Sequence, residues 1–119
     1  MQKIIFPFFL ILILASCTPK ATQNASSTTK ATKVSIQTSA VCGMCESTLE
    51  KALYKVKGVR SMKLDLQTMV ATVVYNPNST TEEDIRQAIV FAGYDADGQQ
   101  ADPEAYQNLH ECCKKGAHD

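Results

Sequence analysis

The stretch Val-Cys-Gly-Met-Cys at residues 41–45 separates two segments of different hydrophobic periodicity. Residues 33–38 alternate between polar and apolar side chains, which is typical of a half-buried strand. Residues 46–57 carry apolar side chains three and four positions apart, which is typical of an amphipathic helix. The pentapeptide is therefore predicted to lie at a strand-to-helix junction, with Cys42 in the loop and Cys45 in the first helical turn.

A Cys-x-x-Cys motif at the beginning of a helix directs both sulfurs to the same side. The unpaired backbone N–H groups of the helix start favour negative charge, and therefore thiolate over thiol. Thiolate is the form that binds soft metal ions and that takes part in thiol–disulfide exchange. Three interpretations are open at this point: a metal site, a dithiol redox centre and a structural disulfide.

The segments after the first helix complete a recognisable order. They are predicted to be a strand at 61–66, a strand at 69–75, a helix between the capping box Thr80-x-x-Glu83 and Gly93, and a weak strand at 94–99. Gly58 is expected to end the first helix. Strand, helix, strand, strand, helix, strand predicts an α+β, ferredoxin-like βαββαβ sandwich, with a four-stranded antiparallel sheet and both helices on one face.

Four short segments resemble the heavy-metal-associated domain family. They read Ala-Val-Cys-Gly-Met-Cys at 40–45, Lys-Gly-Val at 57–59, Asn-Pro at 76–77 and Ala-Gly-Tyr-Asp at 92–95. The family includes copper chaperones, the periplasmic mercury-binding protein and the N-terminal modules of metal-pumping ATPases. The resemblance covers residues 33–99 and implies the same fold, with one soft ion held between Cys42 and Cys45.

The resemblance also implies surroundings and partners for this metal site. Tyr94 takes a loop position beside the metal, and Met44 lies in the loop between the two cysteines. Family members usually have Met two residues before the first cysteine, where this chain has Ala40. The expected partner is a metal-transporting ATPase or another metal-accepting protein. The expected oligomeric state is a monomer, with a metal-bridged dimer as the alternative.

The types of the two ligands favour Cu(I) as the ion. Thiolates select Cu(I), Zn(II) and similar soft ions. Zn(II) requires four ligands in a tetrahedron, whereas the motif supplies two, so Cu(I) ranks above Zn(II). Hg(II) is not separated from Cu(I) on this ground. The alternative function is that of a thiol–disulfide oxidoreductase that uses the dithiol of Cys42 and Cys45.

Residues 1–17 have the features of a bacterial lipoprotein signal peptide. Lys3 precedes an apolar run at 4–14 that is too short for a permanent membrane-spanning helix. The following Leu-Ala-Ser-Cys resembles the lipoprotein processing box, so Cys17 is expected to be lipidated and to anchor the chain. An ordinary secretory signal with an incidental cysteine is the alternative.

The residues after Cys17 predict where the anchored protein lies. An Asp directly after the lipidated cysteine would favour retention at the inner membrane, but this chain has Thr18. The protein is therefore expected in the cell envelope, facing the periplasm, at the outer membrane rather than the inner. Residues 18–32 contain no large apolar side chain and predict a flexible tether. The folded domain is expected at 33–99.

Residues 100–119 extend the chain beyond the family's minimal domain. Asp102-Pro103 is expected to open a short helix with Tyr106, Leu109 and Cys113 at helical spacing. The candidate auxiliary metal ligands in this segment are His110, Cys112 and Cys113. The alternative is a packing helix whose adjacent cysteines are incidental. Because adjacent cysteines rarely bridge each other without strain, they are expected to be free, metal-bound or paired with the main motif.

The composition argues against other classes of function. The chain has 12 basic and 12 acidic residues and no basic patch, which does not suggest a nucleic-acid partner. There is no Ser-His-Asp set, no glycine-rich phosphate loop and no paired carboxylates in an expected cleft. Catalysis is therefore not predicted, and the protein is expected not to be an enzyme.

Overall fold

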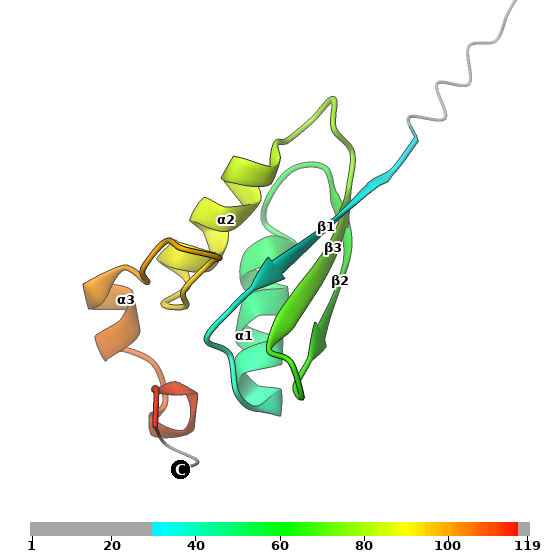
Figure 1. Cartoon of the computed structure of the whole chain (residues 1–119). Helices are drawn as coiled ribbons and strands as arrows, with labels where there is room; N and C mark the ends of the chain where they lie inside the picture. The colour runs from blue at the N-terminus through cyan, green and yellow to red at the C-terminus, as the bar shows by residue number, and fades with distance from the viewer. Residues whose placement is uncertain (1–29, 117–119) are drawn as a thin grey trace, which may run out of the picture.

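The computed structural model describes residues 30–116. Its elements are β1 (Thr32–Gln37), α1 (Gly43–Leu53), β2 (Val59–Asp65), β3 (Val70–Tyr75), α2 (Glu82–Phe91), α3 (Pro103–Gln107) and the 3-10 helix η1 (Glu111–Cys113). The strands form an antiparallel sheet in the order β1-β3-β2, and α1 and α2 cover one face of it (Figure 1). The α+β prediction is thereby confirmed. The predicted signal peptide with Cys17, residues 18–29 of the predicted tether, and His118 lie outside the described residues.

The alternating side chains of the strands build the sheet side of the core. Val34 and Ile36 of β1 pair with Val73 and Ala71 of β3, and Leu64 of β2 pairs with Ala71 from the other side. All five side chains are buried. The period-two pattern of the sequence therefore identified the inward face of the sheet correctly.

The helical spacing of apolar residues supplies the other side of the core. Leu49 and Leu53 of α1 and Ile85 and Ile89 of α2 are fully buried, as one face of an amphipathic helix requires. Their packing fixes the position of α1 on the sheet. The first turn of α1, which contains Cys45, is therefore held in place by the core.

The predicted fourth strand at 94–99 does not form in the described part of the chain. Ala96 makes only isolated bridges with Thr38 and Gln99. The backbone reverses at Asp97, which has a positive φ of 51°. The segment also has a single large apolar side chain, Tyr94, so it offers little to bury against the helices.

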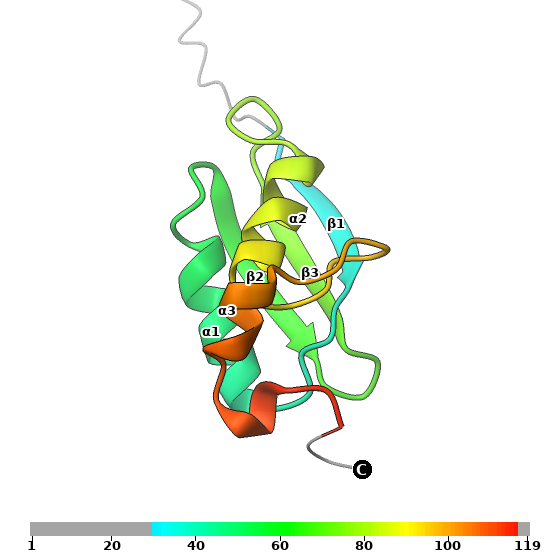
Figure 2. The same cartoon turned by 90° about the vertical axis from the view of Figure 1, so that its left-hand side faces the viewer.

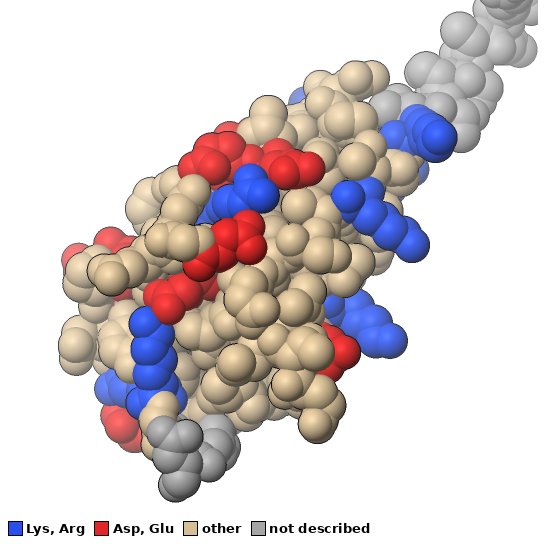
Figure 3. Space-filling view, in the orientation of Figure 1, with Lys and Arg blue, Asp and Glu red and all other residues tan. Residues whose placement is uncertain are grey.

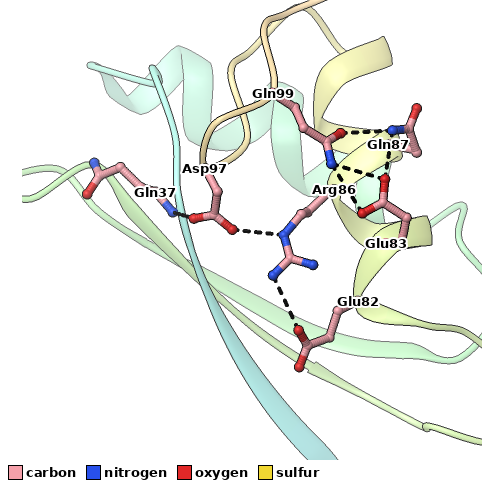
Figure 4. Close-up of polar contacts among 7 residues, drawn as sticks. All are labelled: Gln37, Glu82, Glu83, Arg86, Gln87, Asp97 and Gln99. Atoms are coloured by element: carbon pink, nitrogen blue, oxygen red, sulfur yellow. Dashed lines mark hydrogen bonds and ion pairs between the residues drawn. The ribbon is translucent and has the colours of Figure 1, made fainter.

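A polar cluster holds this reversed segment beside the sheet and α2. The Asp97 carboxylate accepts hydrogen bonds from the Gln37 backbone N–H at 3.0 Å and from Arg86 Nε at 2.8 Å (Figure 4). Arg86 also donates to Glu82 at 3.3 Å. These side-chain bonds replace the ladder that a regular fourth strand would have formed.

Two helix boundaries differ from those predicted. The capping box of α2 uses Thr81 and Asp84 instead of Thr80 and Glu83: Thr81 Oγ1 accepts from the Asp84 N–H at 3.1 Å, and the Asp84 carboxylate accepts from the Thr81 N–H at 3.0 Å. Two consecutive threonines made the register ambiguous, and Asp at the third position serves as well as Glu. Helix α1 ends at Leu53, before Gly58, which has a φ of 100° in the following turn.

The segment after α2 forms two short helices instead of one. Asp102 caps α3 as predicted, since its carboxylate accepts from the Ala105 N–H at 2.9 Å. Helix α3 ends at Gln107, and His110 then caps η1. At the end of α2, Gly93 has a φ of 100°, and a Cβ there would lie 3.0 Å from the Ala105 carbonyl. A glycine at this position is what allows α3 to approach α2 closely.

None of the helices within residues 30–116 combines the length and the apolar character that crossing a bilayer requires.

Candidate metal centre

The Cys-x-x-Cys motif occupies the beginning of α1, as the sequence predicted. Cys42 is the N-cap residue in an extended conformation, and its carbonyl accepts the Glu46 N–H at 3.1 Å. Cys45 lies in the first turn and is fully buried, whereas Cys42 is half-buried. Their sulfurs are 3.1 Å apart. The helix start thus presents one sulfur toward the surface and one toward the core.

The C-terminal segment brings two further sulfurs to the same place. η1 lies beside the first turn of α1 (Figure 2). Cys112 Sγ is 3.4 Å and Cys113 Sγ is 3.8 Å from Cys42 Sγ. The three sulfurs form a group able to hold a metal ion, and no disulfide joins any two of the described cysteines. The predicted auxiliary cysteines are therefore adjacent to the main motif.

Met44, predicted to lie in the loop of the motif, and His110, predicted as a candidate auxiliary ligand, both contact Cys112. The Sδ of Met44, half of whose surface is exposed, lies 3.8 Å from Cys112 Sγ. His110 Nδ1 lies 3.2 Å from the same sulfur and accepts the Cys112 N–H at 3.3 Å. His110 therefore orients Cys112 through the cap of η1 and stands next to the sulfur cluster.

Tyr94, which was predicted to lie beside the metal, lies beside the buried sulfurs of Cys113 and Cys45. Its ring is fully buried, and among residues 30–116 its hydroxyl has no hydrogen-bond partner. Burial is the main cause that raises the pKa of the Tyr94 hydroxyl, and the neighbouring Cys113 and Cys45 sulfurs raise it further. The residue is therefore a neutral phenol that closes the inner side of the site.

The loop before the motif is held by a residue that the sequence reasoning did not single out. Thr38 Oγ1 donates to the Met69 carbonyl at 2.8 Å and accepts the Ala40 N–H at 3.2 Å. Ala40 is fully buried. A threonine at the end of a strand is a weak signal, so only the tertiary structure reveals this role.

The four thiols have different acidities. Burial raises the pKa of Cys42, but hydrogen bonds from Cys45, Cys112 and Cys113 outweigh it and lower the pKa to about 6. Burial, with Cys113 and Cys42 adding to it, raises the pKa of Cys45 to about 12. The Cys42 sulfur raises the pKa of Cys112, and burial raises the pKa of Cys113. The metal-free site therefore holds one thiolate, at Cys42, surrounded by thiols.

Alkylation of the reduced, metal-free protein should report this thiolate. We expect iodoacetamide to modify Cys42 first, with a rate that rises through about pH 6 instead of near the ordinary thiol value of 9.0, because only thiolate is nucleophilic. Peptide mass spectrometry after timed quenching measures the rate at each cysteine. Cys42→Ser should remove the fast phase, and a fast phase that persists in this variant would contradict the assignment.

The described domain matches known metal-binding proteins. The family model described as heavy-metal-associated domain matches residues 36–95. The chain is 37% identical over 54 residues to the copper chaperone CopZ of Staphylococcus haemolyticus, which covers 45% of this chain and 79% of the chaperone. It is 39% identical over 62 residues to copper-transporting ATPase 1 of Rattus norvegicus, which covers 52% of this chain and only 4% of the ATPase.

Solved structures agree with these sequence matches. A structure of a CopZ metallochaperone, 27% identical, superimposes with a TM-score of 0.53 over 55% of this chain and 98% of its own. Oxidized MerP from Ralstonia metallidurans, also 27% identical, has a TM-score of 0.53 over 56% of this chain and 93% of its own. The alternative of a thiol–disulfide oxidoreductase gains no support from these matches. The family match ends before α3 and η1, so it leaves out Cys112 and Cys113.

Proposed function

The chain belongs to the heavy-metal-associated domain family, and on that premise we propose that it binds one Cu(I) ion through Cys42 and Cys45 and carries or sequesters it in the cell envelope. The observation that carries this proposal is the pair of sulfurs 3.1 Å apart at the start of α1. Soft thiolate ligands select Cu(I) over hard cations. The relatives that the chain resembles are a copper chaperone and a copper-transporting ATPase, which also favours copper as the ion.

The two sulfurs of Cys42 and Cys45 suit a soft metal ion that the protein carries and passes on. Cys42 is half-buried and has a lowered pKa, so it offers a thiolate near neutral pH. Cys45 is buried behind it and has a raised pKa, so binding would release its proton. Hg(II) has the same preference for sulfur and remains an alternative cargo. Zn(II) would need more ligands than this pair provides.

Transfer to a partner would begin at Cys42, the more accessible sulfur of the pair. A metal-transporting ATPase or another metal-accepting protein would bring its own thiolate to this side and exchange ligands stepwise. The chain itself is proposed to be a monomer, and a metal-bridged dimer of this chain is the alternative. Anchoring through Cys17, at the periplasmic side of the outer membrane, is proposed from residues 1–18 alone.

An anaerobic titration with Cu(I) in the presence of the chromogenic chelator bicinchoninate tests the proposal. The reduced protein is expected to withdraw one Cu(I) per chain, with a sharp end point, because the Cys42 thiolate and the adjacent Cys45, once it has lost its proton, together compete with a chelator. Full-length protein made in a bacterial host is expected in the membrane fraction. If the chelator keeps all its copper at a large excess of protein, the chain does not serve as a copper carrier.

A further inference from the structure

Three sulfurs, one from the start of α1 and two from η1, form a nearly equilateral triangle. The Sγ atoms of Cys42 and Cys112 are 3.4 Å apart, those of Cys42 and Cys113 are 3.8 Å apart, and those of Cys112 and Cys113 are 3.9 Å apart. The point equidistant from the three sulfurs lies about 2.1 Å from each, close to the metal–thiolate bond length of about 2.3 Å. A soft ion fits between them after a small outward movement.

The Cys42 and Cys45 pair by itself fits an ion less well. A linear complex with two metal–sulfur bonds of about 2.3 Å places the sulfurs roughly 4.6 Å apart, whereas these lie 3.1 Å apart. Cys45 is fully buried and therefore restricted in moving away. The geometry thus favours an ion that also contacts the C-terminal cysteines.

The short helix η1 explains how two adjacent cysteines face one point. Successive side chains in a 3-10 helix are separated by about 120°, whereas in a strand they point to opposite faces. The Cys113 N–H donates to the His110 carbonyl at 2.8 Å, which closes the turn. Cys113 is then 2% exposed, and Cys112 lies against His110 and Met44.

The C-terminal segment, residues 102–116, is fixed to the domain by specific contacts. Lys115 Nζ pairs with the Asp95 carboxylate of the domain at 2.7 Å. Within the segment itself, the Lys115 N–H donates to the Tyr106 hydroxyl at 3.0 Å. The Asp102 N–H donates to the Val90 carbonyl at 3.0 Å. Basic and acidic side chains alternate along the side that carries α2 and this segment (Figure 3). The two cysteines are therefore held in position before any ion arrives.

From these observations we propose that Cys112 and Cys113 are metal ligands, so that the ion is held by at least three thiolates and closed off by the C-terminal segment. The inference rests on the proposed function and goes beyond it, because the matched family domain ends before these cysteines. An enclosed ion is less open to attack by a partner's thiolate. Release then requires residues 102–116 to move, which suits retention of the ion more than rapid delivery.

The test compares Cu(I)-loaded wild-type protein with the variant Cys112→Ser/Cys113→Ser. Gln107→Ser, at an exposed position of the same segment, is the matched control. X-ray absorption spectroscopy counts the sulfurs bound to copper, and bathocuproine disulfonate in excess measures the rate of release. Circular dichroism verifies that each variant remains folded.

We expect three or more sulfurs in the wild type and in Gln107→Ser, and two in the double variant. Release is expected to be about tenfold or more faster in the double variant, since even outer-shell partners of metal ligands typically contribute 10–100-fold. Two sulfurs in the wild type, with release unchanged in the double variant, would overturn the inference and leave the proposed function intact. Wild-type protein that binds no copper would overturn both.

Discussion

Replacing both Cys42 and Cys45 by serine is expected to lower the affinity for Cu(I) by more than about 100-fold, beyond the upper range found for outer-shell partners. Both thiolates at the start of α1 are lost, and serine hydroxyls are poor ligands for a soft ion. Of the single variants, Cys42→Ser should cost more than Cys45→Ser, because the Cys42 sulfur contacts Cys45, Cys112 and Cys113. Competition titration against bicinchoninate under anaerobic conditions measures the affinities.

Ser47→Ala, at an exposed position of the same helix, is the control and should bind copper like the wild type. Cys45→Ser places a hydroxyl in a fully buried position, so circular dichroism of each metal-free variant is needed to separate lost ligation from lost folding. Equal copper affinity of the folded double variant and the wild type would refute the assignment of both ligands.

Leu49→Ala is expected to destabilise the metal-free domain by about 2–5 kcal/mol, the range for truncating a buried leucine. Leu49 is fully buried one helical turn after Cys45. A domain of this size has a small core, and total stabilities are only about 5–15 kcal/mol. The midpoint of urea unfolding, followed by circular dichroism, should fall while the slope of the transition stays the same.

Cu(I) should restore part of the lost stability, because a ligand that binds only the folded chain shifts the equilibrium by mass action. Phe91→Ala is the matched control, since this side chain is 68% exposed and its removal should change the free energy of unfolding by less than about 0.5 kcal/mol. Equal shifts in the unfolding midpoint for the two variants would show that Leu49 does not contribute to the core as described.

Local patterns predicted the parts of the fold that depend on neighbouring residues. The spacing of Leu49 and Leu53, and of Ile85 and Ile89, identified the buried helix faces, and the alternation around Ile36 identified a strand. The position of Cys42 before α1 followed from the same change of periodicity. Each of these features depends on residues that are close together in the sequence, so the local sequence pattern is enough to predict it.

Features that depend on distant partners were predicted less well. The strand expected at 94–99 is replaced by a reversal at Asp97, which Arg86 and the Gln37 N–H hold from other elements. The distance between Cys42 and the auxiliary Cys112 depends on how residues 102–116 fold back over the domain. No local pattern specifies how this segment folds back. Cys112 could therefore be predicted as a candidate ligand from the sequence, but its position beside Cys42 could not.

Gly93 shows how a position remote from the sulfurs can govern them. The Ala105 carbonyl and the Leu109 side chain occupy the space that a Cβ at this position would fill. A side chain at this position would clash with α3 and displace it from α2. The following η1, which carries Cys112 and Cys113, would then move away from Cys42. Cys42 and Cys45 would keep their positions in α1, but η1 would no longer lie beside them. A substitution at Gly93 would in this way open the proposed metal site without changing any of its proposed ligands.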